Sequence, residues 1–400
     1  MNLGHDADPP HSRIISPALT LLLAIACGLI VANIYYAQPL GGPIAAALGL
    51  PKEGAGLVVT LTQIGFAAGL LFLVPLGDLI ENRRLVLGLI GVATLALLVA
   101  ALSSRPLPFL PAMFCIGIGS VAVQVLVPYA AHLAPEAIRG RVVGNVMSGL
   151  MLGIMLARPT ASFITELSSW HVVFFLSAAV MILLALVLCA VLPKRVPASQ
   201  MHYGELLFSM WRIVLATPIL RRRALYHACL FGAFSLFWTA TPLLLAGPAF
   251  HLSQGGIAVF ALVGVAGAIA APIGGRVADR GWSRPATGLA MLAVATAFLI
   301  THIGRQGSML SLGLLAAAAV LLDLGVSANM TLGQRAIFVL NAEYRSRLNA
   351  LYMTTFFIGG AIGSAVGGWA FAFGGWTLTA WIGFAAPVAA LLYYATEKTQ

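Results

Sequence analysis

Asp323 is the only carboxylate that lies deep within a long apolar stretch of this 400-residue sequence. An ionised carboxylate in such surroundings costs about 2.5 kcal/mol or more, so Asp323 must face a wet cavity, pair with a cation or bind a proton. Because burial disfavours the ionised form, Asp323 is the candidate for a proton-coupling residue. The structural alternative is a hydrogen-bonded anchor between two helices.

Arg158 is the sole basic residue within an apolar stretch, and it immediately precedes Pro159. It could pair with Asp323, attract an anionic ligand, or extend outward to Glu166. Steps of 100° along a helix place Ser327 and Gln334 on the same face as Asp323. These side chains therefore form a candidate binding surface around the buried acid.

The composition shows which elements must position these residues. Hydrophobic residues make up 60% of the chain, charged residues 8%, and the mean hydropathy is +0.98, which excludes a water-soluble fold. Stretches of about 20 apolar residues predict twelve membrane-spanning helices. These spans cover approximately 15–38, 55–77, 85–102, 107–131, 142–163, 172–192, 225–246, 255–273, 286–303, 309–332, 348–371 and 378–395.

The positive charges predict the orientation. Of the 22 Lys and Arg residues, 18 fall in connections on one side, while Lys52, Arg105 and Arg305 fall on the other. Lys and Arg in short loops resist translocation, so both termini are predicted to be cytoplasmic. The basic residues occur in small groups between apolar runs, so the net charge of +10 does not indicate nucleic-acid binding. The spacing of Cys and His predicts neither a metal site nor another cofactor.

The two halves of the sequence repeat. Arg139, Arg141, Met147, Gly153 and Trp170 are each matched by the same residue type 206 positions later. We therefore predict an all-α membrane protein of two pseudo-symmetric six-helix bundles, residues 1–192 and 224–400. Residues 193–223 form the predicted linker, in which apolar residues at helical spacing precede Arg221, Arg222 and Arg223. This pattern favours an amphipathic helix on the inner leaflet, with a loosely ordered loop as the alternative.

Several segments carry a family resemblance over nearly the whole chain. The segment Gly275-Arg-Val-Ala-Asp279-Arg280-Gly281-Trp-Ser-Arg284 resembles the loop signature of the major facilitator superfamily. A looser version, Pro75-Leu-Gly-Asp78-Leu-Ile-Glu81-Asn-Arg83-Arg84, occurs in the first half. The segments around Asn33, Met147 and Arg345 further resemble the bacterial branch that contains sugar-efflux and purine-nucleoside-efflux proteins. Many proton antiporters of the superfamily carry an Arg in the fourth span, where this chain has Met113.

The resemblance implies two sets of functional residues. Contacts between acidic loop residues and helix N-termini latch the cytoplasmic side in the superfamily, which implies a gating role here for Asp78, Arg83, Arg139, Asp279, Arg280 and Arg345. Spans one, four, seven and ten line the cavity of the resembled fold. Gln63 in span two and Arg158 in span five are added to the polar and aromatic residues of these spans. The predicted binding residues are then Asn33, Tyr36, Gln38, Gln63, Gln124, Arg158, Phe234, Trp238, Ser327 and Gln334.

These observations predict a monomeric, multi-pass transporter in a bacterial inner membrane. It is expected to export small organic molecules, such as sugars, nucleosides or drug-like compounds, by alternating access in exchange for protons. A proton-coupled uptake symporter is the alternative, since the same parts could build it. A membrane-embedded enzyme is a distant alternative, because it would require a metal cluster or paired intramembrane acids.

Overall fold

The computed structural model describes residues 15–197, 201–264, 282–340 and 345–397. The described residues form α-helices and short 3-10 turns, as predicted from their composition. The helices of the first half are α1 Pro17–Tyr35, α2 Ala37–Leu48, α3 Ala55–Phe72, α4 Asn82–Leu102, α5 Pro106–Ser120, α6 Ala122–Leu133, α7 Arg139–Leu167 and α8 Trp170–Val191. They are followed by α9 Tyr203–Ala216, α10 Pro218–Ala246, α11 Gln254–Ala261, α13 Ser283–Ile300, α14 Met309–Phe338 and α15 Arg345–Ala395.

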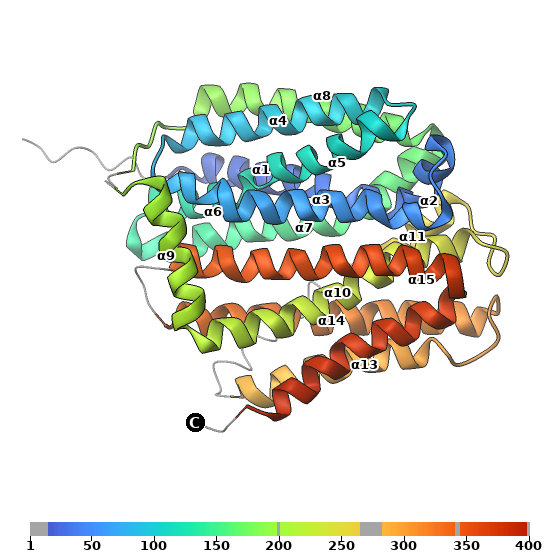
Figure 1. Ribbon diagram of the computed structural model, residues 1–400. Helices are drawn as coiled ribbons and strands as arrows, with labels where there is room; N and C mark the ends of the chain where they lie inside the picture. The colour runs from blue at the N-terminus through green and yellow to red at the C-terminus, as the bar shows by residue number, and fades with distance from the viewer. Residues whose placement is uncertain (1–14, 198–200, 265–281, 341–344, 398–400) are drawn as a thin grey trace, which may run out of the picture.

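The arrangement of these helices is consistent with twelve membrane spans. Ten segments among the described residues are long and apolar enough to cross a membrane, and they run side by side in Figure 1. The 51-residue α15 bends at Gly375, whose φ of 58° favours glycine, so it supplies two of the predicted spans. The apolar segment Gln254–Gly264 begins the predicted span 255–273, whose remaining residues lie outside the described part of the chain.

The helix boundaries differ from the predicted ones where local chemistry interrupts or extends a helix. The span predicted at 107–131 consists of α5 and α6, which meet at Val121. The first span continues beyond its predicted end through α2, whose last turn is closed by Gly49 in the left-handed conformation. α10 begins at Pro218, well before its predicted start, because proline is readily accommodated in the first turn of a helix.

Closely packed glycines join equivalent helices in the two halves. A Cβ built on Gly153 of α7 would lie 2.1 Å from the Gly28 carbonyl oxygen of α1. A Cβ built on its repeat partner Gly359 of α15 would lie 2.3 Å from the Ala228 carbonyl oxygen of α10. The same pair of spans is thus joined backbone to backbone in each half, as expected of a duplicated bundle.

The halves meet near the end of the molecule that carries Lys52, Arg105 and Arg305, which we call the arginine-poor end. Here α2 contacts α10, α3 contacts α15, and α7 contacts α11. Gly56 of α3 packs against the backbone of Ser364 and Gly368, and the Thr60 hydroxyl lies 2.8 Å from that of Ser364. The Glu166 carboxylate accepts a hydrogen bond from the Gly255 amide at 2.9 Å. These contacts seal this end in the conformation observed.

The opposite end, which we call the arginine-rich end, carries Arg83, Arg139, Arg222, Arg284 and Arg345 among others. Helix α9 lies across the spans at this end and contacts α10, α15 and the 3-10 turn Val74–Asp78 (Figure 1). It buries Leu206 and Met210 and leaves Phe208, Trp211 and Leu215 exposed. A helix with both a packed and an open apolar surface suits the boundary between protein, lipid and water.

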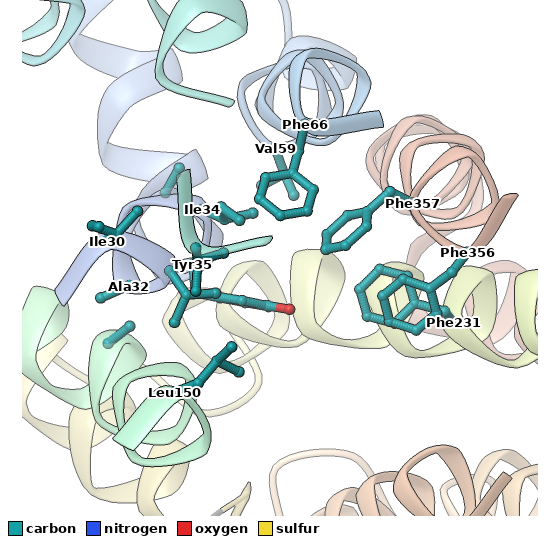
Figure 2. Close-up of a cluster of buried hydrophobic side chains, with 14 of the residues drawn as sticks. Ile30, Ala32, Ile34, Tyr35, Val59, Phe66, Leu150, Phe231, Phe356 and Phe357 are labelled. Atoms are coloured by element: carbon teal, nitrogen blue, oxygen red, sulfur yellow. The ribbon is translucent and has the colours of Figure 1, made fainter. Parts of the chain in front are cut away.

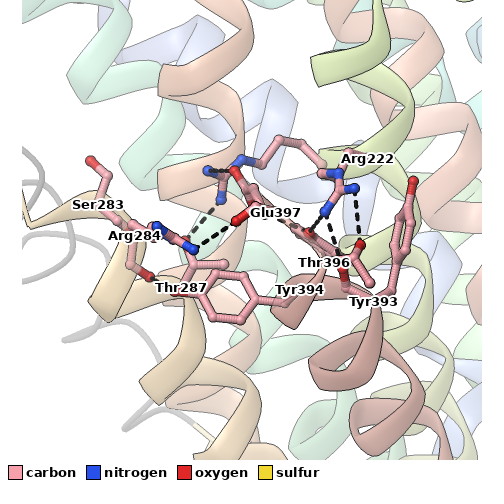
Figure 3. Close-up of polar contacts among 10 residues, drawn as sticks. Arg222, Ser283, Arg284, Thr287, Tyr393, Tyr394, Thr396 and Glu397 are labelled. Carbon is pink, nitrogen blue, oxygen red and sulfur yellow. Dashed lines mark hydrogen bonds and ion pairs between the residues drawn. The ribbon is translucent and has the colours of Figure 1, made fainter. Parts of the chain in front are cut away.

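A polar cluster at the arginine-rich end fixes the last helix of the second half. Glu397 forms an ion pair with Arg223 at 3.2 Å and accepts a hydrogen bond from the Tyr226 hydroxyl at 3.1 Å. Arg284 of α13 donates to the Glu397 carbonyl oxygen at 2.7 Å (Figure 3). Arg222 donates to the Tyr393 carbonyl oxygen at 3.0 Å. The cluster therefore connects α10, α13 and the end of α15.

Candidate functional site

Three adjoining cavities form a chamber between the two halves. The mouth cavity, of about 500 Å³, is lined at the arginine-rich end by His132, Arg139, Arg345 and Ser346. The aromatic cavity, of about 350 Å³, shares Gln124 and Asn349 with it. The charged cavity, of about 480 Å³, contains Arg158 and Asp323, and shares Phe234, Ser327 and Gln334 with the aromatic cavity. Shared walls make these cavities one central chamber, of a size suited to small molecules.

Aromatic side chains from both halves line the aromatic cavity. Tyr35 of α1 points toward Phe231 and Phe356 of the second half (Figure 2). The ring centroids of Phe231 and Phe356 lie 3.5 Å apart in a stacked arrangement. Phe66 of α3 and Phe357 of α15 approach each other with centroids 4.3 Å apart. The cavity therefore offers flat apolar surfaces on which a ring or an apolar chain can pack.

The charged cavity contains the predicted proton-coupling residue. Asp323 is 5% exposed, and its Oδ1 accepts a hydrogen bond from the Trp238 indole at 2.9 Å. A Cβ built on Gly264 would lie 2.9 Å from Asp323 Oδ2 and 3.0 Å from the Trp238 ring. The backbone at Gly264 thus lies directly against the carboxylate. Trp238 and Gly264 together fix the position of the acid at the wall of the chamber.

Arg158 lies beside this carboxylate and is 3% exposed. Its Nε donates to Gln38 Oε1 at 2.6 Å, while its Nη2 has no hydrogen-bond partner. The guanidinium carbon lies 4.3 Å from the centroid of Trp238 and 5.0 Å from that of Phe234. A cation over aromatic faces gains about 0.5–2 kcal/mol, which partly offsets its removal from water.

The structure distinguishes among the three arrangements considered for Arg158. Among the ion pairs of the described residues, none joins Arg158 to Asp323 or to Glu166. Glu166 is instead bonded to the Gly255 amide at the seal between the halves. A Cβ built on Gly264 would lie within 3.4 Å of both Arg158 Nη1 and Asp323 Oδ2. The two charges are therefore close neighbours in one cavity, with Arg158 oriented inward.

Other predicted binding residues occupy different parts of the chamber. Phe234, Ser327 and Gln334 line both the charged and the aromatic cavities. Gln334 Nε2 donates to Asn349 Oδ1 at 3.1 Å, so these two amides form a polar strip between α14 and α15. Gln124 of α6 lines the aromatic and mouth cavities. The chamber therefore contains neutral hydrogen-bonding groups as well as the two buried charges.

Five of the ten predicted binding residues are not among the described residues that line these three cavities, namely Asn33, Tyr36, Gln38, Gln63 and Trp238. Gln38 and Trp238 instead hydrogen-bond to the lining residues Arg158 and Asp323. Asn33 faces α8, where its Oδ1 accepts from the Ser177 hydroxyl at 2.5 Å and its Nδ2 lies 3.5 Å from Met181 sulfur. Tyr36 is half-buried at the junction of α1 and α2. Gln63 Nε2 donates to the Ser235 hydroxyl at 2.7 Å across the contact between the halves. In this conformation Asn33 supports helix packing and Gln63 supports the seal.

A second buried polar cluster lies behind the aromatic wall. His227 Nδ1 is 3.0 Å from Asn329 Nδ2, and its ring stacks on Phe356 with centroids 4.3 Å apart. His227 Nε2 and the Tyr352 hydroxyl are buried without a hydrogen-bond partner. This cluster holds α10, α14 and α15 together and supports the wall from outside the chamber.

Comparison with known families decides which architecture this is. The profile of the Major Facilitator Superfamily matches residues 20–316. The chain belongs to that superfamily. The predicted all-helical fold of two pseudo-symmetric bundles is therefore confirmed, and the protein is a multi-pass membrane transporter of the major facilitator type.

Individual relatives agree with this assignment. The chain is 40% identical over 369 residues to the "Uncharacterized transporter YgaY" of Escherichia coli O157:H7, with 92% of each protein covered. It is 32% identical to the "Probable transporter SCO4007" of Streptomyces coelicolor, over 89% of this chain and 82% of that protein. Among solved structures, that of the nucleoside transporter NupG matches with a TM-score of 0.74 at 13% identity, over 94% of this chain and 98% of NupG.

Four of the residues with an implied gating role are described by the structure, and they lie at the arginine-rich end. Arg139 and Arg345, which are repeat partners, line the mouth cavity from opposite halves. Arg83 donates to the carbonyl oxygens of Cys189 and Leu192 at the end of α8, within its own half. Asp78 is half-buried and is attracted electrostatically by Arg347 and Arg195. Asp279 and Arg280 lie outside the described residues.

Several residues of the chamber wall were not predicted from the sequence. Tyr35, rather than Tyr36, faces the aromatic cavity, and Asn349 supplies an amide beside Gln334. Methionines that line the aromatic cavity were also missed, namely Met147, Met151, Met330 and Met353. The repeat gave one usable signal, because Met147 and Met353 occupy matched positions in the two halves. Flexible methionine side chains suit a wall that must accommodate an irregular ligand.

Proposed function

We propose that this transporter moves small organic molecules through the central chamber by alternating access and couples their movement to protons, with Asp323 as the proton-binding residue. The position of the Asp323 carboxylate carries the proposal. It is buried, it lines the chamber, and only its Oδ1 accepts a hydrogen bond from another described residue. A carboxylate in that position can exchange a proton with the chamber while its other oxygen stays fixed by Trp238.

The distribution of contacts supports alternating access. The mouth cavity lies between the halves at the arginine-rich end, while the contacts of α2 with α10, α3 with α15 and α7 with α11 close the arginine-poor end. We infer that the arginine-rich end is cytoplasmic in a bacterial inner membrane, because Lys and Arg in short loops remain inside. The observed state is then open to the cytoplasm. In the opposite state Arg139 and Arg345 would approach each other, and Asp78 with Arg347 would contribute to the latch.

Export in exchange for protons is the first of two coupling modes that fit this chamber. It requires that substrate and proton exclude one another at Asp323. The resemblance to bacterial efflux proteins favours this mode. A neutral or cationic solute that hydrogen-bonds to the ionised carboxylate would be released when Asp323 takes up a proton from outside.

Uptake together with protons is the second mode, and the position of Arg158 favours it. Protonation of Asp323 removes the negative charge that faces this guanidinium. A substrate that binds Arg158 would then bind more strongly to the protonated protein, so proton and substrate would cross together. Accumulation in everted vesicles, compared with right-side-out vesicles, distinguishes export from uptake.

Replacing Asp323 by Asn tests the proton-binding role. Purified wild-type protein and the variant are placed in liposomes that contain a pH-sensitive dye, and outward or inward gradients of glucose, uridine, ethidium or 2-naphthalenesulfonate are applied. We expect at least one gradient to drive proton flux in the wild type, and Asp323→Asn to reduce that flux at least about tenfold. Glu136→Gln, an exposed acid on a 3-10 turn, is the matched control and should leave the flux unchanged. Undiminished flux in a folded Asp323→Asn protein would contradict the assignment.

A further inference from the structure

The guanidinium of Arg158 has unused hydrogen-bonding capacity at the wall of the chamber. Arginine remains protonated in proteins and carries five N–H donors arranged to match a carboxylate. Here Nε is bonded to Gln38 but Nη2 has no partner, although Arg158 is 3% exposed. Asp323 does not supply the missing partner, since it is bonded to Trp238 and no ion pair joins it to Arg158. An unpaired donor on a buried cation is costly, and an anionic ligand would satisfy it.

We propose that the substrate is an aromatic organic anion whose carboxylate is bound by Arg158 and whose ring packs in the adjoining aromatic cavity. This inference rests on the proposed transport function and names its substrate class. Phe234 lines both cavities and lies 5.0 Å from the guanidinium carbon, so the charged and aromatic surfaces are continuous. Cavities of about 480 Å³ and 350 Å³ suit a molecule with one or two rings.

The charges along the chamber favour an anion over a zwitterion or a cation. Arg139 and Arg345 line the mouth cavity from opposite halves, and its described lining residues include no acid. Arg158 follows deeper in the chamber, where Asp323 is the only acid among the described lining residues. A mouth lined by positive charges raises the local concentration of anions and lowers that of cations. An amino acid has no net charge, so this field would not concentrate it as it concentrates an anion.

The adjacent acid links anion binding to protonation. The groups that face Asp323 are Arg158 from α7, Tyr35 from α1, Trp238 from α10 and the backbone at Gly264. Arg158 is the only one of them that is positively charged. With Asp323 ionised, the two buried charges attract each other; with Asp323 protonated, the guanidinium charge is available to a carboxylate. Proton and anion thus assist each other's binding, which selects cotransport from the two coupling modes.

Binding measurements on the purified transporter test the anion site. The probes are 3-phenylpropionate, its neutral amide, phenylalanine and phenethylamine, titrated by calorimetry into wild type, Arg158→Gln, Arg158→Lys and the control Arg305→Gln, an exposed residue at the arginine-poor end. We expect Arg158→Gln to weaken binding of the carboxylate at least about tenfold and of the amide less than about threefold. Arg158→Lys should recover part of the loss. Equal weakening of both probes, or stronger wild-type binding of phenethylamine or phenylalanine, would overturn the proposal.

The linkage to Asp323 provides a readout that a purely structural role of Arg158 would not change. Wild-type affinity for 3-phenylpropionate should rise as the pH is lowered, whereas Asp323→Asn should bind it at least as tightly as the wild type and without this pH dependence.

In liposomes, 2-naphthalenesulfonate serves as the probe, because it does not cross the bilayer as a neutral acid. An inward gradient of this anion should acidify the interior in the wild type but not in Arg158→Gln. Alkalinisation would overturn cotransport of an anion while leaving proton coupling intact. Proton flux with neutral or cationic solutes alone would overturn the substrate class, and absence of flux with every solute would contradict the proposed function itself.

Discussion

At the scale of single residues, three groups described in this structure define the surroundings of one buried acid. Trp238 fixes one oxygen of Asp323, Arg158 provides the neighbouring positive charge, and Gly264 allows the backbone to lie against both. Asp323 and Arg158 could be selected from sequence because charged residues within apolar spans are rare and expensive. Gly264 could not, because nothing in the sequence distinguishes it from the other 41 glycines. Its importance follows only from the close approach of side chains that are far apart in the chain.

Gly264→Ala should therefore impair coupling more than folding. The added methyl group would lie 2.9 Å from Asp323 Oδ2 and 3.0 Å from the Trp238 ring, so the hydrogen bond between them must shift. Overpacking of this kind costs about 1–3 kcal/mol, and the same energy added to the transport barrier would lower the transport rate by about 5- to 150-fold. Solute-driven proton flux in liposomes measures the effect. Gly140→Ala, where an added methyl meets no atom within 4 Å, should transport at the wild-type rate; similar losses in both variants would argue against a specific role for Gly264.

At the scale of helices, apolar length predicted the spans well, while side-chain direction was harder to predict. Tyr35 and Tyr36 are adjacent, yet Tyr35 faces the chamber and Tyr36 sits at the junction of α1 and α2. Asn33 was expected in the chamber but faces α8. A helix that is apolar on all sides gives no periodic signal for its orientation, so the choice depends on contacts with other helices. The 206-residue repeat was more informative, because Gly153 and Gly359 make equivalent contacts.

These equivalent contacts predict matched effects of substitution. In Gly153→Ala the added methyl would lie 2.1 Å from the Gly28 carbonyl oxygen, and in Gly359→Ala it would lie 2.3 Å from that of Ala228. Because rigid backbone blocks both positions, each variant should be destabilised by about 1–3 kcal/mol and should show a lower unfolding temperature in detergent. Gly88→Ala and Gly313→Ala meet no atom within 4 Å and should unfold at or slightly above the wild-type temperature. A stable Gly153→Ala protein would show that this helix seam is not tightly packed.

At the scale of the whole molecule, the two halves touch at one end and separate at the other. The seal uses small side chains and short polar contacts, such as Gly56 against Ser364 and Thr60 with Ser364. Because these surfaces contain few charged groups, few ion pairs would be broken when the surfaces separate. The contact is therefore suited to repeated opening. The duplication and the family resemblance predicted this overall plan. Which end is closed depends on the free-energy difference between the two conformations of the molecule. No sequence pattern gives that difference directly.

The central claim is that one chamber opens to the two ends in turn, and paired distance measurements test it most directly. Spin labels are attached by cysteine substitution at Gly140 and Ser346, on either side of the mouth cavity, and separately at Lys52 and Phe373, in the two halves at the arginine-poor end. All four positions are exposed, and the native cysteines Cys27, Cys115, Cys189 and Cys229 are replaced beforehand. We predict that double electron–electron resonance will show two populations, in which a shorter 140–346 distance accompanies a longer 52–373 distance, with proton or substrate concentration shifting their ratio. Distances that stay fixed, or that lengthen together at both ends, would contradict alternating access.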